Sequence, residues 1–252
     1  FNLVGLEKNP GFKISLKMLN RVIIALAYGD LLMRVLYRIR PYEKIKGSAE
    51  ILYNSFVKKC NDSIKTGNLI TFSRLVKEIV EKFDTLEISN QPKPRVGLVR
   101  EILVKFHPTA NNNIVEVVEN EGAEAVMPDL IDFFLYSAYD GIFKYKYLSG
   151  SFGKNIKSRI IIGFIELYRR GLKKALRESK RFSPPPSIYE LAKSATKILS
   201  LGNQTGEGWF LTAEMIELID CGAENIVCMQ PFACLPNHVT GKGMIRELKR
   251  RY

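Results

Sequence analysis

The sequence predicts an α/β fold in which a helical N-terminal part is followed by a parallel sheet with flanking helices. Over the first ninety residues, apolar side chains recur at the three- and four-residue spacing of helices. After the break at Asn90–Pro94 (NQPKP), short strand-like runs alternate with helical segments. That order gives parallel strands joined by right-handed crossovers.

The break at Asn90–Pro94 is the best domain boundary in the chain. We therefore predict a helical subdomain over residues 1–90 and a Rossmann-like α/β domain over residues 91–252. The helices of the first part are expected at Ile14–Tyr28, Ala49–Ile64 and Leu69–Phe83.

The second part is expected to form a parallel sheet of about four strands. Three of them are predicted in short apolar runs, at Val96–Val99, Ala125–Met127 and Ile226–Met229. A loop through His107-Pro108 is expected after the first strand. Helices are predicted at Asn111–Glu121, Leu130–Leu148, Ile156–Lys180, Ile188–Leu199, Glu207–Cys221 and Thr240–Tyr252.

The composition is that of a globular protein in a reducing compartment. Hydrophobic residues make up 46% of the chain and charged residues 25%, and the apolar runs are far shorter than the roughly 20 residues that cross a bilayer. Four cysteines in 252 residues are too sparse for a disulfide scaffold, so we expect a cytoplasmic protein with reduced thiols. Because the chain starts without Met and stops within a helical pattern, we expect a piece of a longer protein, truncated at its C-terminus.

The net charge of +12 is concentrated in one segment. Between Lys144 and Arg181, twelve Lys or Arg accompany two Glu, which gives +10, whereas Arg95–Phe143 has three basic and eight acidic residues, which gives −5. The basic segment is either a solvated helix face or a docking surface for an anionic partner. An acidic protein and the phosphates of coenzyme A are candidates, and nucleic acid is disfavoured because no recognition motif accompanies the charge.

The two histidines of the chain, His107 and His238, each follow a predicted strand and precede a helix. Ligands of open α/β sheets bind at that edge, so we expect both side chains to line one crevice, although each also fits a purely structural role. The loop after His107 carries three consecutive residues, Asn111, Asn112 and Asn113, which is more than one helix cap requires. The additional Asn side chains either bind a carbonyl or phosphate, or serve turn geometry alone.

A glycine-rich stretch, SLGNQTGEGWF from Ser200, lies ahead of a predicted helix. Such loops cradle phosphate, so Gly206 and Gly208 are predicted to shape a ligand pocket. The spacing matches neither the dinucleotide fingerprint nor the P-loop, and no nucleotide is predicted from it.

The strongest candidate site is CMQPFACLPNHVTGKG, which begins at Cys228. Cys234 is expected on a solvent-reachable loop ahead of a helix, a position that suits a metal or redox ligand. Cys228 is expected to be buried in the sheet, and Cys60 and Cys221 to pack helices. The six-residue step from Cys228 to Cys234 matches no zinc motif, so a single thiolate is at most part of a ligand set.

Three stretches of the chain resemble the C-terminal region of large acyl-CoA dehydratase activase-related proteins, of the 2-hydroxyacyl-CoA dehydratase/activase group. They are LAYGDLLMRVLYRIRPYE, RVGLVREILVKFHPTANNNIVEVVENEGAEAVMPDLIDFFLY and SLGNQTGEGWFLTAEMIELIDCGAENIVCMQPFACLPNHVTGKGMIRELKRRY. Together with the chain between them, the match covers most of the sequence. One departure is Arg100, in GLVREI, where the family leads us to expect glycine in GLVGEI. A bulky side chain there would hinder a close approach of a ligand to the backbone.

The resemblance implies an iron–sulfur context in anaerobic metabolism. In such proteins an ATPase portion precedes a portion similar to the dehydratase subunits, which hold a 4Fe–4S cluster through Cys thiolates between Rossmann-like domains. The ATPase portion passes them one electron at low potential, driven by ATP. No phosphate motif of that portion appears in this chain, so we expect ATP to bind only elsewhere in the same polypeptide.

The sequence therefore favours an iron–sulfur redox module of a dehydratase/activase-like protein. Carried over from the resemblance, Cys234 is the metal ligand, with the other cluster ligands outside this chain. The whole protein would be a reductase or dehydratase-activase type of enzyme, whereas this fragment alone would lack the cluster and activity. The alternative is a module that binds CoA, a CoA thioester or another anion without redox chemistry. The residues predicted to bind this small molecule are His107, Asn111, Asn112, Asn113, Gly206, Gly208 and His238.

Overall fold

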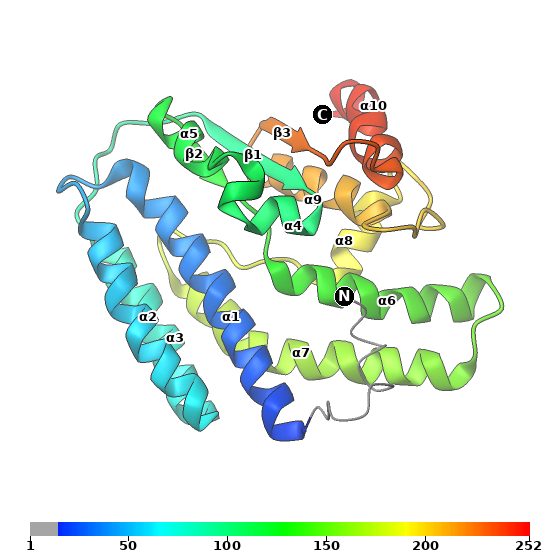
Figure 1. The fold of residues 1–252 in the computed structure, drawn as a ribbon, viewed down its shortest axis with the longest axis horizontal. Coiled ribbons are helices and arrows are strands. Elements are labelled where there is room, and N and C mark those ends of the chain that lie inside the picture. Colours follow the sequence, from blue (N-terminus) through cyan, green and yellow to red (C-terminus); the bar gives the residue numbers. More distant parts are fainter. Residues whose placement is uncertain (1–14) are drawn as a thin grey trace.

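A computed structural model describes residues 15–252 and has the expected α/β architecture, with a layer of long helices packed beside a small parallel sheet (Figure 1). The N-terminal helices are α1 (Leu16–Ile39), α2 (Ser48–Thr66) and α3 (Leu69–Asp84). Helix α1 runs well beyond its predicted end at Tyr28. Its inward face continues through Leu31, Leu32, Val35, Leu36 and Ile39, all of which are buried.

The sheet consists of β1 (Arg95–Arg100), β2 (Glu124–Val126) and β3 (Asn225–Met229) in the order β2-β1-β3. Both pairings are parallel, which confirms the three predicted strands. Within residues 15–252 the sheet has three strands rather than about four. Gly97 of β1 is needed where α9 crosses the sheet, because a Cβ at that position would lie 2.9 Å from Leu218 Cδ1.

Helices cover both faces of this sheet. Helix α9 (Trp209–Asp220) packs on one face with Val99, and α5 (Ile114–Asn120) packs on the other with Leu98. The predicted loop after β1 instead contains a short helix, α4 (Ile102–Phe106), which the Glu101 carboxylate caps by accepting from the N–H groups of Leu103 and Val104. Shorter elements are 3-10 helices at Arg40–Tyr42, Pro108–Asn111 and Lys242–Met244, a π-helical turn at Asn237–Gly241, α8 (Ile188–Ala195) and α10 (Ile245–Arg251).

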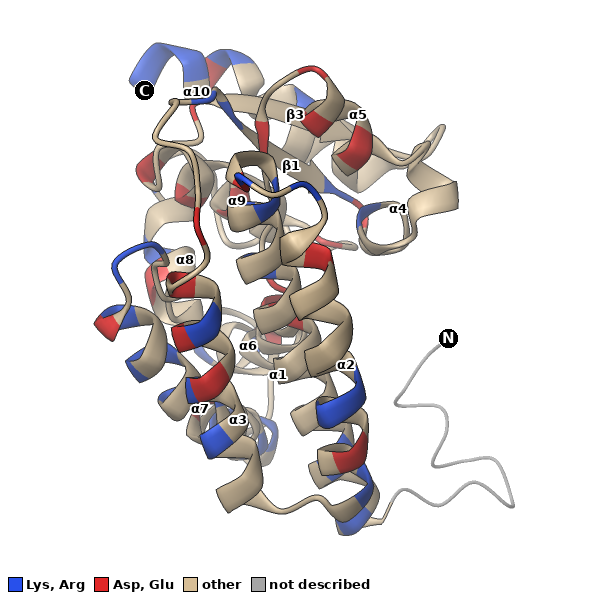
Figure 2. Ribbon diagram, turned by 90° about the vertical axis from the view of Figure 1, so that its left-hand side faces the viewer, with Lys and Arg blue, Asp and Glu red and all other residues tan. Residues whose placement is uncertain are grey.

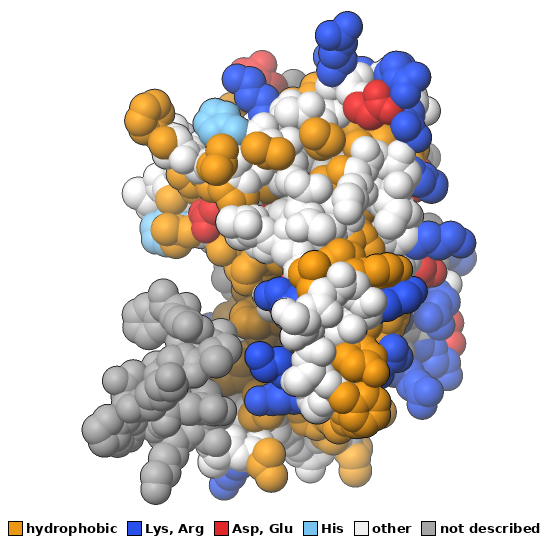
Figure 3. Space-filling view, turned by 90° about the vertical axis from the view of Figure 1, so that its right-hand side faces the viewer, with side chains coloured by type: hydrophobic (Ala, Val, Ile, Leu, Met, Phe, Trp, Pro, Cys, Tyr) orange, Lys and Arg blue, Asp and Glu red, His pale blue; other side chains and the backbone are white. Residues whose placement is uncertain are grey.

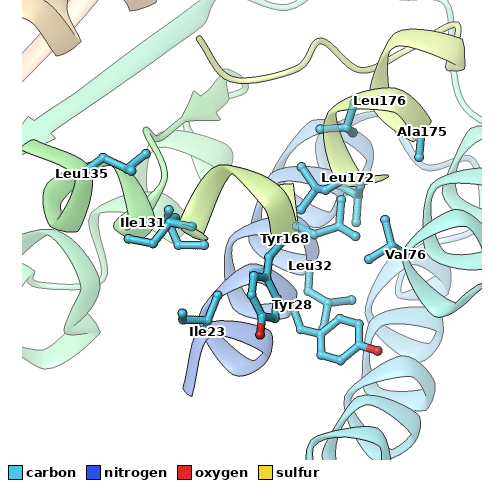
Figure 4. Packing of buried hydrophobic residues seen from close by; sticks show 14 of the residues in the cluster. Ile23, Tyr28, Leu32, Val76, Ile131, Leu135, Tyr168, Leu172, Ala175 and Leu176 are labelled. Atoms are coloured by element: carbon cyan, nitrogen blue, oxygen red, sulfur yellow. The ribbon is translucent and has the colours of Figure 1, made fainter. Parts of the chain in front are cut away.

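The largest core joins the N-terminal helices to a hairpin from the second half of the chain, α6 (Leu130–Tyr147) and α7 (Phe152–Glu178). Figure 4 shows Leu172 of α7 lying near Leu32 of α1 and Val76 of α3. The Asp30 carboxylate of α1 also accepts from the N–H groups of Leu130 and Ile131 at the start of α6. The helical layer thus draws on sequence from both sides of residue 90. Among residues 15–252, no helix is both long and apolar enough to span a membrane.

Candidate functional site

The loops that follow the three parallel strands leave the sheet at one edge, where open α/β sheets bind ligands. Because β1 and β3 are neighbours, His107 after β1 and His238 after β3 both follow strand ends at this edge. Figure 3 shows both histidines, in pale blue, on one face of the molecule with hydrophobic side chains beside them. The positions after the strand ends are as expected from the sequence, whereas the shared crevice and a ligand-binding role for the two side chains stay predictions.

Cys234 lies on the loop after β3, as predicted, and is partly exposed. Its N–H donates to the Pro231 carbonyl, and its own carbonyl accepts from the His238 N–H at 3.1 Å. Ala233 beside it has a φ of 61°, so the backbone turns through the left-handed region. The tip of this turn is apolar and uncovered, with Phe232 fully exposed and Leu235 69% exposed.

Cys228 is only half-buried, which corrects the expectation of a fully buried thiol. The reason is that β3 is an outer strand of the sheet and is not enclosed by strands on both sides. Burial and then the nearby Glu214 carboxylate raise the pKa of Cys228 above its usual value. A Cβ on Gly241 would lie 3.2 Å from Cys228 Sγ, so this thiol packs beneath the turn at Asn237–Gly241.

The other two cysteines lie on different elements, away from the Cys234 loop. Cys60 is buried in the core of the helical layer, and burial raises the pKa of its thiol to about 12. Cys221 lies at the C-cap of α9, ahead of β3, and is exposed, so the expectation that it packs between helices is wrong. Within residues 15–252, no three His, Cys, Asp or Glu side chains are grouped so as to hold a metal ion. A metal-ligand role for Cys234 stays a prediction, and residues 15–252 do not by themselves make the donor set of a four-iron cluster.

His238 lies against Gln230, another residue of the loop that follows β3. The Gln230 side-chain nitrogen lies 3.1 Å from His238 Nδ1 and 3.3 Å from Nε2, so the amide sits over the ring edge. The glycine-rich stretch packs against the same region, because a Cβ on Gly206 would lie 3.0 Å from Pro236 Cγ. Gly206, Cys234 and His238 thus belong to one surface.

The glycine-rich loop is folded on itself. The Gly208 N–H donates to Thr205 and the Trp209 N–H donates to Asn203, so these two donors do not point outward. Gly208 has a φ of 48° and a ψ of −134°, a conformation that essentially only glycine adopts. A Cβ there would lie 2.1 Å from the Asn203 carbonyl oxygen. Gly206, with a φ of 61°, and Gly208 are thus both explained by backbone conformation. A phosphate bound at this loop would find no backbone donor at Gly208 or Trp209.

The predicted ligand residues after β1 form a second group. Asn111 is buried and caps α5, since its Oδ1 accepts from the Ile114 N–H, while its amide donates to the Val104 carbonyl. Asn112 and Asn113 both adopt left-handed backbone conformations, with φ values of 55° and 52°. Asparagine tolerates this region better than most residues, so turn geometry explains part of the triplet. The His107 imidazole Nδ1 accepts from the Ala110 N–H at 3.3 Å and caps the 3-10 turn.

A cavity of about 380 Å³ lies between this loop, α1 and α2. Asn111 and Asn113 line it together with Lys105, Tyr37 and Met127. Two of the predicted ligand residues therefore face a space of the size that small-molecule sites use.

Arg100, at the end of β1, is the residue that sequence reasoning undervalued. Its side chain is only 1% exposed, and no carboxylate of residues 15–252 lies within 4 Å of it. Nη1 donates to the Val104 carbonyl, Nη2 lies 3.7 Å from Met127 Sδ, and Nε has no partner in the described part of the chain. Burial lowers the pKa of this guanidinium to about 10. The departure from the expected glycine thus places an unpaired positive charge beside the cavity that Met127 lines.

A buried ion pair, Lys105 with Glu214, lies at the same edge and was also missed. Burial raises the pKa of Glu214 to about 7, although the Lys105 ammonium opposes the shift. Arg100, Lys105 and Glu214 line a small cavity of about 10 Å³, which is close to the volume of one water. The available signal was the lone carboxylate in the otherwise apolar run WFLTAEMI, since such a residue in a buried helix needs a partner.

No family model, curated protein or solved structure matches this chain in the comparisons with known proteins.

Proposed function

We propose that this chain is the redox-site module of a dehydratase/activase-like protein and contributes Cys234 as one thiolate of a shared iron–sulfur centre. The supporting observation is the position of Cys234, a partly exposed thiol on a turn at the ligand-binding edge of the sheet. The uncovered side chains of Phe232 and Leu235 beside it suit a surface that another domain or subunit covers. A centre at such an interface takes its remaining ligands from the covering part.

Such a cluster would supply one-electron transfer, with ATP acting on a portion outside this chain. The residues described here would hold and position Cys234. The turn from Pro231 to His238 fixes the backbone on both sides of the thiol through the two backbone hydrogen bonds at Cys234. Gly206 permits the close packing of the glycine-rich loop against Pro236.

The test is the iron and sulfide content of the full-length protein, prepared without oxygen. Cys234→Ser should remove most of the bound iron and the visible absorption. Cys221→Ser and Cys228→Ser are the matched controls, and both should keep the iron. Full iron content and an unchanged spectrum in Cys234→Ser would contradict the proposal.

A second candidate function, binding of an anionic group without redox chemistry, is favoured by Arg100. A buried charge without a counter-ion is costly, and a bound carboxylate or phosphate would remove that cost. Met127 separates the guanidinium from the 380 Å³ cavity, and a thioether side chain moves easily between rotamers. The phosphates of coenzyme A or of an acyl-CoA have the chemistry that this cavity would take.

Thermal unfolding in the presence of inorganic phosphate, acetate or coenzyme A tests this candidate. Each anion that binds should raise the Tm, because binding stabilises the folded state by RT ln(1 + L/Kd), where L is the free anion concentration. Arg100→Met should abolish the rise, whereas Arg246→Met, at an exposed position on α10, should not. An equal rise in wild type and Arg100→Met would show that the anions act elsewhere.

A further inference from the structure

Helix α7 carries an apolar stripe on its solvent side. Five large apolar residues, spaced four, four, four and three positions apart, remain 37% to 65% exposed along its first four turns. They are Phe152, Ile156, Ile160, Phe164 and Leu167. The opposite side of α7 is fully used, since Ile162, Ile165, Leu172 and Leu176 pack in the core of the helical layer. The stripe is therefore a second apolar face, and exposed faces of this kind mark interaction sites.

Glycines lie within the same stripe. Gly163 and Gly171 are exposed, and a Cβ at either position would meet no atom within 4 Å. With Ile160 and Leu167 they form a row spaced three, four and four residues apart. Glycine inside a helix is destabilising relative to alanine, and among residues 15–252 no atom lies within 4 Å of the space that a Cβ would fill at either position. Small residues between large ones let the backbone of a second helix approach closely.

The exposed charges beside the stripe are mostly basic, and fewer basic side chains reach the surface than the sequence indicates. Arg169 and Lys173 are buried and paired with acidic residues, so neither belongs to the surface. After Leu167 the exposed side continues as Arg170, Lys174 and Arg177, with Glu178 as its acidic neighbour. Figure 2 shows basic positions along the ribbon of α7, and Figure 3 shows Lys and Arg beside hydrophobic side chains at the end of the molecule where the α6–α7 hairpin turns.

We propose that the outer face of α7 docks an amphipathic helix of a partner, apolar over about four turns and acidic over the next two. The apolar section would lie on Phe152–Leu167, with its closest approach at Gly163. The acidic section would lie opposite Arg170, Lys174 and Arg177. Basic side chains near a helix C-terminus interact favourably with the helix dipole, which explains part of the basic section in the free protein. This interaction does not explain the apolar stripe.

A second copy of this chain is a poorer occupant. In a parallel pairing, the basic ends of two α7 helices would face each other. In an antiparallel pairing, Arg170 and Lys174 would face Lys154 and Lys157 of the other copy, which are also exposed and basic. Like charges across an interface cost several kcal/mol. An anionic membrane surface would accept the charges, but the two glycines add no apolar area to insert into it.

The proposal is tested with a synthetic peptide that forms an amphipathic helix with Leu and Ala on its apolar face and Glu over its last two turns. The matched peptide carries Lys in place of Glu. Fluorescence anisotropy at low and high salt should show binding of the Glu peptide, weakened by salt, and binding of the Lys peptide at least about tenfold weaker. Ile160→Glu and the pair Arg170→Glu with Lys174→Glu should each weaken the Glu peptide by about tenfold or more.

The variant Gly163→Ala distinguishes an effect on peptide binding from an effect on the stability of the fold. It should raise the Tm of the protein, because the position is exposed in a helix, and yet weaken binding of the peptide. Gly29→Ala in α1 is the control, since Gly29 is also exposed with no atom near its Cβ, and it should raise the Tm without affecting binding. Equal affinity for both peptides, no binding of either, or preference for vesicles of anionic phospholipid would overturn the proposal. So would concentration-dependent self-association that Ile160→Glu abolishes.

Discussion

Arg169 and Arg100 are each only 1% exposed, yet they lie in regions of opposite electrostatic character. Arg169, in the junction between α6 and α7, has Glu166 at 2.9 Å and Asp132 at 2.9 Å, with Asp129 at 3.8 Å. The contact with Asp132 is a charge contact whose angle is too bent for a hydrogen bond. Arg100, at the edge of the sheet, has a carbonyl and a sulfur for neighbours and no carboxylate within 4 Å among residues 15–252.

The difference indicates what each region does. The junction is an acidic site within the fold, where Asp129 and Asp132 have Arg34 and Arg169 as counter-ions, and Asp30 accepts from the N–H groups of Leu130 and Ile131. It joins α1 to the α6–α7 hairpin, and its arginines have carboxylate partners within the fold. The sheet edge is electrostatically incomplete at Arg100. A buried charge without a counter-ion beside a cavity is more informative about ligand binding than a buried charge that is paired within the fold.

The largest expected effect comes from removing Arg169. Arg169→Met would leave Asp132 and Asp129 buried with one fewer cation, which costs about 3–5 kcal/mol of unfolding free energy. Urea denaturation followed by circular dichroism measures this change. Arg170→Met, one residue along and exposed, is the control and should change stability little. A loss below about 1 kcal/mol for Arg169→Met would mean that the junction is not held by its ion pairs.

A smaller effect is expected from pH, through Glu214 between the two regions. Its pKa is raised from an ordinary value near 4.5 to about 7 by burial, so the folded protein binds more protons than the unfolded chain in this window. The contribution of Glu214 to the free energy of unfolding is therefore fully present below about pH 4.5, and it is lost as the pH rises through about 7. Glu217, whose pKa burial raises to about 8, acts in the same direction. From Glu214 alone we expect a loss of about 2–3 kcal/mol between pH 5 and pH 8, since one pKa unit corresponds to about 1.4 kcal/mol.

Urea midpoints measured across that pH range test the assignment. Glu214→Gln should flatten the dependence on pH, whatever it does to stability at one pH. Glu224→Gln, on the exposed turn before β3, should leave the slope unchanged. A stability that increases between pH 5 and pH 8 would contradict the raised pKa of Glu214.

Much of the fold was readable from the sequence because its signals are local. The strands and most helices follow apolar periodicity, and all three predicted strands are present. Helix α1 was predicted too short, since the helical apolar spacing was followed only as far as Tyr28, just before Gly29 and Asp30. Asp30 is buried because it caps α6, one hundred residues later, and such a contact has no signature in the local pattern.

The candidate site was readable only in part, for the same reason. The loop position of Cys234 follows from Pro231 and Pro236 on either side of it. The burial of Lys105 depends on Glu214, 109 residues away, and that of Lys173 depends on Glu166 and the Pro186 carbonyl. A lysine that pairs within the fold cannot be told from a surface lysine by composition. The basic segment therefore carries less surface charge than its sequence implies.

The smallest expected effect is the most diagnostic, and it concerns Arg100 itself. Arg100→Met removes a buried charge that has no carboxylate partner within 4 Å among residues 15–252 and replaces it with an apolar chain of similar length. Since replacing buried charges by apolar residues is often neutral or stabilising, we expect a gain of about 1 kcal/mol or no change in anion-free buffer. Urea denaturation in a buffer of bulky organic ions measures it. Lys105→Met is the contrast, because it would leave Glu214 buried without its cation and should be destabilising by several kcal/mol. If Arg100→Met cost as much as Lys105→Met, the guanidinium would be a structural group whose bond to the Val104 carbonyl holds α4 in place, and the case for an anion beside it would fail.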